Sequence, residues 1–306
     1  MPPQPTGNDA FDAARAGGIV DTFLSFPDVR AEKAKVYDFI RKATRDRETQ
    51  TMEMPAGYLF KDLPSYDEID DPLELTLQEM DRFGISRFLT NVTDKDVARR
   101  ALTEHPDRFW GLLNVDPNTG MDALRAIDAA VETWGDQLKA IHTWGTALVP
   151  QVPLDDKKMY PIYAKCVEVG RPIVVYTGVP GPRLPMSAQL PMQLDEVCWF
   201  FPELRIVSRH GAEPWTELMV KLLLKWPNLY YSTSAFAPKH YPPHIVDYAN
   251  TRGADKILFA GYWAAGLTLD RIHAELPQVG FRDHVWPKFL RENAEAVFGA
   301  APHPYP

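Results

Sequence analysis

Short β-rich runs alternate with longer amphipathic stretches along most of this chain, and that alternation constrains the fold more than any other feature. The runs are rich in Ile, Val, Leu, Phe and Tyr, as strands buried on both faces must be. Strands are expected at residues 18–24, 86–92, 109–115, 138–144, 172–178, 204–210, 228–234 and 256–262. Helices are expected between them, for example at 72–84, 159–170 and 214–227. This order predicts an α/β fold with a parallel sheet.

Eight strand–helix units predict a (β/α)8 TIM barrel, and a doubly wound open sheet is the alternative. An open sheet usually carries a glycine-rich phosphate loop after its first strand, and neither GxGxxG nor GxxxxGK[ST] occurs in this sequence. We therefore predict one barrel domain over residues 18–300. A flexible lead-in is expected at 1–17 and a short tail at 301–306.

The connection at residues 25–71 is much longer than the few residues that usually join a strand to its helix. Residues 31–48 within it have a helical pattern. Because a loop that follows a barrel strand lies at the catalytic face, the segment is expected to be a lid-like insertion or a subunit contact. The alternative is a solvated helix packed over the mouth of the barrel.

Composition excludes several classes of protein. The 306 residues are 45% hydrophobic, which excludes global disorder, and the net charge of −8 argues against a nucleic-acid partner. Two cysteines, Cys166 and Cys198, make no disulfide framework and fit a reducing cytoplasm, so a cytoplasmic protein is expected. The longest apolar run, near 257–267, is about half the ~20 residues of a bilayer span, so no membrane association is expected.

Five segments resemble the amidohydrolase-related family, the branch that includes aromatic-acid decarboxylases and lactone hydrolases. They are PIVVYTGVPGP (172–182), HGAEPW (210–215), KWPNLYYSTSAF (225–236), KILFAGYW (256–263) and RENAEAVFG (291–299). The resemblance extends from about Val20 to Ala300. It implies a (β/α)8 barrel of the metallo-dependent-hydrolase type, in agreement with the strand count.

The resemblance also implies a divalent metal held by four histidines and an aspartate, and most of those positions differ here. The two first-strand histidines correspond to Phe23 and Ser25, and the fifth-strand histidine corresponds to Tyr176. The sixth-strand histidine is present as His210, and the eighth-strand aspartate corresponds to Tyr262. A catalytic zinc needs three protein ligands with N, O or S atoms. We therefore expect no metal and no other cofactor.

Four residues are candidates for catalysis. His210 is expected to act as a metal-free acid–base group, or else to be a hydrogen-bonded histidine at the barrel mouth. His142 ends the fourth expected strand, and a neutral imidazole can take up a proton near pH 7. Tyr176 and Tyr262 could donate hydrogen bonds to a carboxylate or an oxyanion. Alternatively, their rings simply fill the cavity that the metal would occupy.

Four further residues are candidates for substrate binding. Asn91 and Ser234 are polar residues at strand ends, although either could be a local cap. Trp144 and Trp263 could form an aromatic wall for a flat ligand, or could be ordinary packing. Asp21, inside the first strand, is interpreted as an orienting carboxylate or a buried structural group.

Two functions follow. The first is a hydrolase or carbon–carbon lyase that acts on a small, apolar, carboxylated or lactone-like molecule without a complete metal site. The second is a catalytically silent barrel that scaffolds a metal-competent homologous subunit. A homo-oligomer or a hetero-oligomer with a homologous barrel is expected in either case. An oligomer would cover apolar patches that five aromatic residues would otherwise expose, unless these residues fold inward. They are Tyr58, Phe60, Trp286, Phe289 and Phe298.

Overall fold

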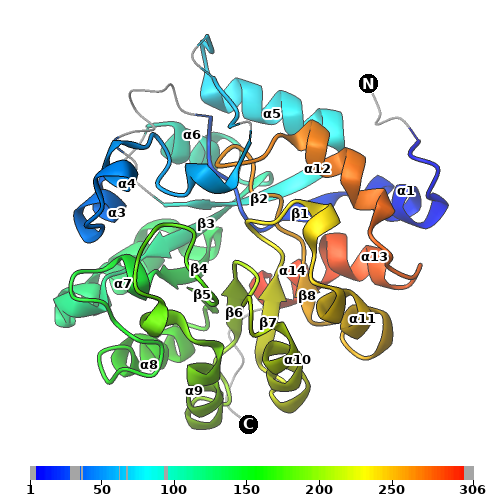
Figure 1. The fold of residues 1–306 in the computed structure, drawn as a ribbon. Helices are drawn as coiled ribbons and strands as arrows, with labels where there is room; N and C mark the ends of the chain where they lie inside the picture. The colour runs from blue at the N-terminus through cyan, green and yellow to red at the C-terminus, as the bar shows by residue number, and fades with distance from the viewer. Residues whose placement is uncertain are drawn as a thin grey trace.

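The computed structural model describes residues 5–27, 35, 37–61, 63–66, 68–92 and 96–299, and within them it contains a single sheet of eight parallel strands. The order is β1 (Ile19–Asp21), β2 (Ile85–Asn91), β3 (Phe109–Asn114), β4 (Leu138–Thr143), β5 (Ile173–Tyr176), β6 (Ile206–Arg209), β7 (Leu229–Ser232) and β8 (Ile257–Leu258). Extensions of β1 and β8 meet through the Thr22 N–H, which donates to the Phe259 carbonyl at 3.1 Å. The predicted (β/α)8 barrel is confirmed (Figure 1).

Side chains alternate between the two faces of each strand, and this period of two divides the core into two layers. The barrel interior is filled by one residue or two from each strand, among them Val20, Leu89, Leu112, Ala140, Val174, Val207 and Leu258. The neighbouring positions, such as Ile19, Phe88, Ile141, Ile173 and Ile206, face the surrounding helices. Both layers are buried, which explains why the strands have continuous apolar sequences.

Helices surround the strands (Figure 1). They are α5 (Pro72–Phe83), α6 (Asp96–Glu104), α7 (Met121–Trp134), α8 (Tyr160–Glu168), α9 (Leu194–Phe200), α10 (Thr216–Lys225), α11 (Pro243–Thr251) and α12 (Leu269–Glu275). The helix expected at 214–227 begins two residues later, at Thr216, because Trp215 has a non-helical ψ of 37° and is the N-cap. No helix in the described ranges has the length and apolar character to cross a bilayer.

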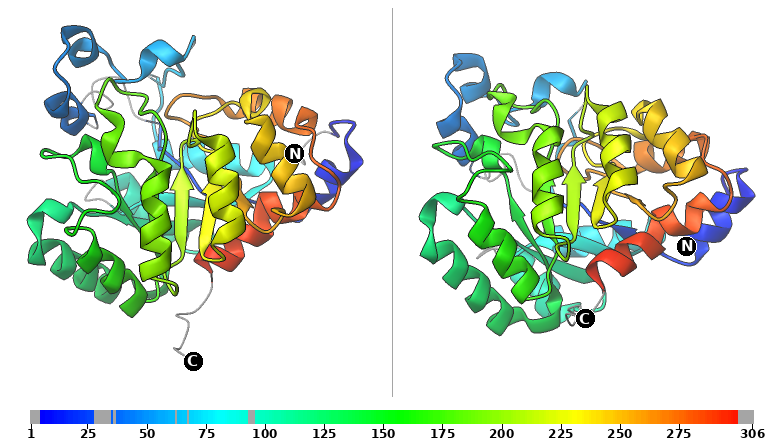
Figure 2. Two further views of the ribbon diagram at one scale, coloured as in Figure 1. Left: turned by 60° about the horizontal axis from the view of Figure 1, so that its bottom comes forward. Right: turned by 90° about the horizontal axis from the view of Figure 1, so that it is seen from below.

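The C-terminal helical segment closes one end of the barrel. It consists of α13 (Val285–Pro287), a π-helical turn at Lys288–Glu292 and α14 (Asn293–Phe298). Val297 and Phe298 pack against the interior layer of strand residues. Figure 2 shows this segment in red at the opposite end of the barrel from helices α3 (Asp38–Ala43) and α4 (Arg47–Thr51). The other end therefore keeps the carboxyl ends of the strands accessible.

Aromatic residues that were expected to form an exposed patch fold inward instead. Trp286 and Phe289 are fully buried, and Phe298 is 2% exposed. Trp286 packs edge-on against Phe11, with the ring centroids 5.1 Å apart. Phe11 belongs to helix α1 (Asp9–Ala16), so the structure replaces part of the expected flexible lead-in with a packed helix. These three residues therefore contribute nothing to the apolar surface that was expected to favour an oligomer.

The described part of the long insertion includes two short α-helices in the region where a single helix was expected at 31–48. Residues 28–34 and 36 lie outside the described residues, and the described part contains α3 (Asp38–Ala43) and α4 (Arg47–Thr51). The chain leaves the helical conformation at Thr44 because Asp46 caps α4, accepting from the Thr49 N–H at 2.8 Å. Ile40 of α3 packs against Ala147 and Leu184. The insertion therefore lies over loops that follow β4 and β5.

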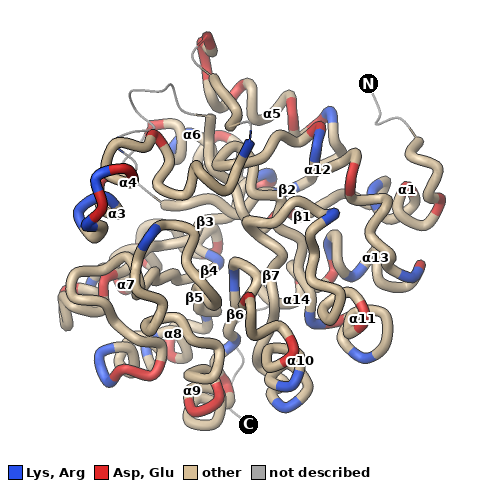
Figure 3. The backbone as a smooth tube through the Cα atoms, viewed as in Figure 1, with Lys and Arg blue, Asp and Glu red and all other residues tan. Residues whose placement is uncertain are grey.

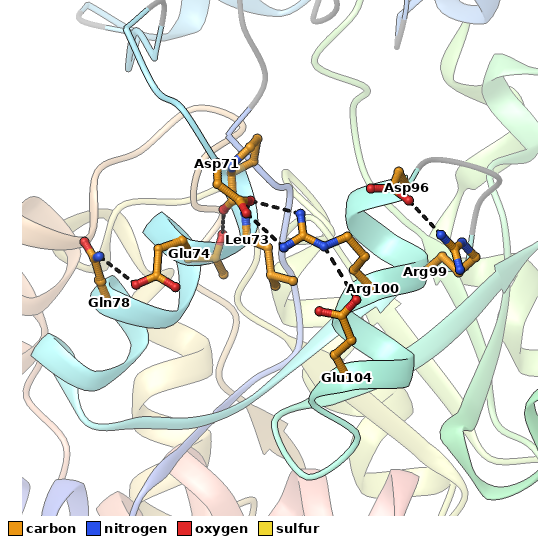
Figure 4. Close-up of polar contacts among 10 residues, drawn as sticks. Asp71, Leu73, Glu74, Gln78, Asp96, Arg99, Arg100 and Glu104 are labelled. Atoms are coloured by element: carbon orange, nitrogen blue, oxygen red, sulfur yellow. Dashed lines mark hydrogen bonds and ion pairs between the residues drawn. The ribbon is translucent and has the colours of Figure 1, made fainter.

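Charged residues of both signs are distributed over the outer helices (Figure 3). One network joins α5 to α6 (Figure 4). Asp71 caps α5 by accepting from the Leu73 N–H at 2.9 Å, and it also accepts from both terminal nitrogens of Arg100, at 2.9 and 3.3 Å. The hydrogen bonds from Arg100 lower the pKa of the Asp71 carboxyl. This residue thus stabilises a helix start and a contact between neighbouring helices.

We predict that Asp71→Ala lowers the free energy of unfolding by about 1 kcal/mol, the usual cost of losing an N-cap. Asp71→Asn keeps the capping oxygen and loses the charge and one acceptor for Arg100, so its cost is smaller than that of Asp71→Ala, which loses all three. Because the folded pKa of Asp71 is depressed, the contribution of the charge exists above the unfolded pKa and disappears as the pH falls. Urea unfolding at pH 7 and pH 3 measures both effects. Equal losses for the two variants would contradict the capping role.

Candidate active site

A cavity of about 530 Å³ lies at the carboxyl ends of the strands, beneath the insertion. Its lining includes Tyr37, Phe39 and Ile40 from the insertion, and Asn91, His142, Tyr176, Arg209, His210 and Tyr262 from the strand ends. The carboxyl ends of barrel strands are where active sites of this fold are found. The volume is in the range typical of pockets that hold a small molecule.

The floor of the cavity is the next interior layer of the barrel. Asn91, Asn114, His142, Tyr176 and Arg209 each lie two residues beyond an interior apolar residue of the same strand. The period of two therefore aims all five inward. Apolar side chains fill the layers below, and this layer is polar.

His210 faces the same cavity although it directly follows Arg209. Its φ of 66° takes the backbone out of the extended conformation, so consecutive side chains can both line the site. Tyr262 has a φ of 63°, and strained non-glycine residues of this kind cluster at functional sites. His210 Nδ1 forms a hydrogen bond with Ser234 Oγ at 2.8 Å. Ser234 is not a lining residue, so it orients His210 rather than contacting a ligand.

The two candidate histidines lie on either side of Tyr176. The ring of His210 stacks on Tyr176 at 4.1 Å between centroids, and the ring of His142 lies 4.8 Å from Tyr176. His142 Nδ1 pairs with Asn114 Oδ1, and the Asn114 amide donates to Asn91 Oδ1 at 3.0 Å. The Nε2 atom of His142 is buried and has no partner among the described residues. An unmet donor or acceptor at a cavity wall is available to a ligand.

Both imidazoles are neutral at pH 7. Burial lowers the pKa of His210 to about 3, and the charge of Arg209 adds to this effect. Burial also lowers the pKa of His142 well below its usual value, again with a contribution from Arg209. Both histidines are therefore uncharged and only weakly basic in the unliganded protein.

Aromatic rings form most of the remaining wall. The ring centroid of Trp144 lies 4.7 Å from that of Tyr176 and 5.8 Å from that of Phe39. Trp144 lines the cavity, as the sequence suggested. Trp263 does not. It is 2% exposed and packs on Phe88, because the bend at Tyr262 turns the next side chain toward the outer layer. Trp263 is therefore not part of the cavity lining, and its contact with a substrate stays a prediction.

Arg209 was missed by the sequence analysis. Its side chain is 4% exposed, its Nη2 donates to the Thr22 carbonyl, and its guanidinium lies 5.1 Å from the centroid of the Phe23 ring. The available signal was the period of two, because Arg209 follows the interior residue Val207 at i+2. The adjacent histidine drew attention to position 210 instead. Asn114 was also missed, and the same period of two would have found it, because it follows the interior residue Leu112 at i+2.

Asp21 is fully buried near this cation. Its Oδ1 accepts from the Gly261 N–H at 2.9 Å and from the Phe23 N–H at 3.0 Å, whereas its Oδ2 has no partner in the described part of the chain. Burial raises the pKa of Asp21 to about 7, and the two backbone donors and Arg209 oppose that rise. The carboxyl thus ties the ends of β1 and β8 together.

The residues at the family's metal positions do not fit a divalent cation. The phenols of Tyr176 and Tyr262 are held neutral, because burial raises the pKa of each. The ring of Phe23 lies 4.7 Å from Tyr262, and the guanidinium of Arg209 adds a positive charge to the same space. Across the described residues, no three His, Cys, Asp or Glu side chains are grouped as metal ligands.

The sequence matches the family model described as Amidohydrolase over residues 24–300. The chain therefore belongs to the amidohydrolase family. No match was found among curated proteins.

Solved structures with a similar fold include three barrels of low sequence identity. An uncharacterized TIM-barrel protein from Bordetella bronchiseptica is 24% identical, with a TM-score of 0.71 over 92% of this chain and 98% of the other. A 2,6-dihydroxybenzoate decarboxylase from Rhizobium is 17% identical, with a TM-score of 0.59 over 92% and 98%. A 4-oxalomesaconate hydratase from Rhodopseudomonas palustris is 17% identical, with a TM-score of 0.59 over 92% and 95%. At these identities the similarity concerns the fold alone.

We predict that Asp21→Asn becomes more stable relative to the wild type as the pH rises from 5 to 8. The folded pKa of about 7 exceeds the unfolded value, so the native wild type binds the extra proton between about pH 4 and pH 7 and loses stability across that window. Asparagine keeps an acceptor for the Gly261 N–H and has no such titration. Urea unfolding of both proteins at pH 5 and pH 8 measures how the difference in their free energies of unfolding changes with pH. A difference that is the same at both pH values would contradict the prediction.

Proposed function

We propose that this chain is an enzyme that acts on a small, apolar, carboxylated or lactone-like molecule as a hydrolase or carbon–carbon lyase. The observation that supports this most is the open cavity with a polar floor. A silent barrel would be expected to fill the space of the lost metal with Phe23, Tyr176, Tyr262 and Trp263. Instead Trp263 packs elsewhere, and a cavity of about 530 Å³ separates the rings from the insertion.

His210 is proposed as the acid–base group. Ser234 holds Nδ1, so Nε2 is the nitrogen left for proton transfer. In a lactone hydrolysis, neutral His210 takes a proton from the attacking water and returns it to the leaving alkoxide. The phenols of Tyr176 and Tyr262 remain protonated and can donate to the tetrahedral oxyanion. His142 lies across Tyr176 as a second neutral base.

We further propose that this chemistry proceeds without a complete metal site. The support is the donor set, in which one imidazole, two neutral phenols and an arginine take the place of a ligand-rich centre. The same loss favours the alternative function, a silent subunit that scaffolds a metal-competent barrel. The open cavity favours the enzyme. Assembly with a second barrel stays a prediction, because three of its five aromatic residues are buried.

We predict that His210→Ala reduces turnover on the order of 100-fold or more, as loss of a general acid–base group does. Suitable probes are 2,6-dihydroxybenzoate, monitored by CO₂ release, and dihydrocoumarin, monitored by ring opening. Tyr262→Phe deletes one donor and keeps the ring, so its loss should be smaller. Near-ultraviolet circular dichroism verifies that each variant is folded. Turnover of His210→Ala at the wild-type rate would remove this mechanism.

We also predict that the purified protein contains much less than one tightly bound divalent metal per chain. Elemental analysis of protein grown with added zinc, manganese and iron measures this directly. Thermal unfolding before and after dialysis against a chelator should give the same midpoint. About one metal per chain, lost in His210→Ala, would show that the donor set binds a cation after all.

A further inference from the structure

Arg209 is a buried cation with incomplete partners. Its side chain is 4% exposed at the end of β6, inside the cavity. One terminal nitrogen donates to the Thr22 carbonyl, and the phenol oxygen of Tyr176 also interacts with the guanidinium. The Nε atom is buried and has no acceptor in the described part of the protein. A guanidinium has five N–H donors in a planar fork, so Arg209 has N–H donors left for a ligand, including that of Nε.

No carboxylate neutralises this charge at contact distance. Among the described residues, no Asp or Glu oxygen lies within 4 Å of the guanidinium, although ion pairs of that length occur across the outer helices. Asp21 is the carboxylate whose charge acts on Arg209, and both of its hydrogen bonds come from backbone N–H groups. Removing an unpaired charge from water is costly. A bound ligand of opposite charge would offset that cost.

The surroundings specify the kind of anion. Among the described residues that line the cavity, Arg209 is the one Lys or Arg and Asp116 is the one carboxylate. Asp116 accepts from the Asn118 N–H at 2.8 Å, and its own charge disfavours a ligand with more than a single negative charge. A phosphate dianion would leave a second charge without a partner. The walls are rings, including Phe23, Trp144 and Tyr176, which suit a flat apolar body. Carboxylate matches the guanidinium fork in a bidentate manner.

We propose that Arg209 is the anchor of a carboxylate-binding site, and that its ligand is a small, planar monocarboxylate whose ring lies between the aromatic walls. This inference deepens the proposed function, because it names the substrate class of the same cavity. The positive charge that a metal supplies in a ligand-rich barrel is supplied here by a side chain. Asn91 and the free Nε2 of His142 face the remaining part of the ligand.

The test is binding, measured by isothermal titration calorimetry with benzoate and with its uncharged analogue benzamide. Wild-type protein should bind benzoate at least tenfold more tightly than benzamide. Arg209→Gln should remove that preference, whereas Arg209→Lys should retain part of it. The matched control is Arg183→Gln, because Arg183 is 39% exposed, is paired with Asp46 and Glu48 and lies outside the cavity lining. That variant should bind benzoate as the wild type does.

Equal affinity of the wild type for benzoate and benzamide would overturn the proposal, and so would an Arg209→Gln variant that keeps the preference. Absence of benzoate binding at millimolar concentration would also overturn it. If Arg209→Gln fails to fold, the comparison of the two ligands in the wild type still decides. A silent barrel that binds benzoate through Arg209 would contradict the enzymatic function and leave this inference standing. If the protein turned over a neutral lactone but bound benzoate no more tightly than benzamide, the enzymatic function would stand and this inference would fail.

Discussion

The site depends on one electrostatic constraint, a guanidinium buried at the end of β6 without a carboxylate partner at contact distance in the described residues. Arg209 is held by the Thr22 carbonyl and by the ring of Phe23, and its charge helps to lower the pKa of both candidate histidines. The neutral imidazoles, the protonated phenols and the raised pKa of Asp21 all reflect the same low-polarity surroundings. An arriving carboxylate would change each of these properties together.

The barrel supplies this arrangement through simple geometry. Strand residues alternate between interior and exterior, so the layer above the apolar interior presents Asn91, Asn114, His142, Tyr176 and Arg209 to one cavity. The left-handed backbone conformation of His210 directs its side chain into the same cavity. Val297 and Phe298 close the opposite end of the barrel. The chemistry is therefore confined to the carboxyl ends, beneath helix α3.

The strands were predictable because burial on both faces demands continuous apolar runs, and all eight were found within a few residues of their expected bounds. His142 was a candidate because it ends the fourth expected strand, and Tyr176 because the resemblance aligns it with a metal-ligand position; both line the cavity. Arg209 was not a candidate, because a charged residue beside a family histidine gives no local sign that it points inward. Trp263 was misplaced because the backbone bend at Tyr262 has no signature in an apolar segment. The break between α3 and α4 depended on one capping residue, Asp46.

Arg209 and the two candidate imidazoles share one cavity of low polarity, and NMR titration of ¹⁵N-labelled histidines in the unliganded protein tests this directly. The His210 ring should stay neutral down to about pH 4, because burial and Arg209 lower its pKa to about 3. In Arg209→Gln the midpoint should move upward, toward the usual value of about 6.5. A His210 signal that titrates near pH 6.5 in both proteins would place the ring in water, away from the cation, and would contradict the account.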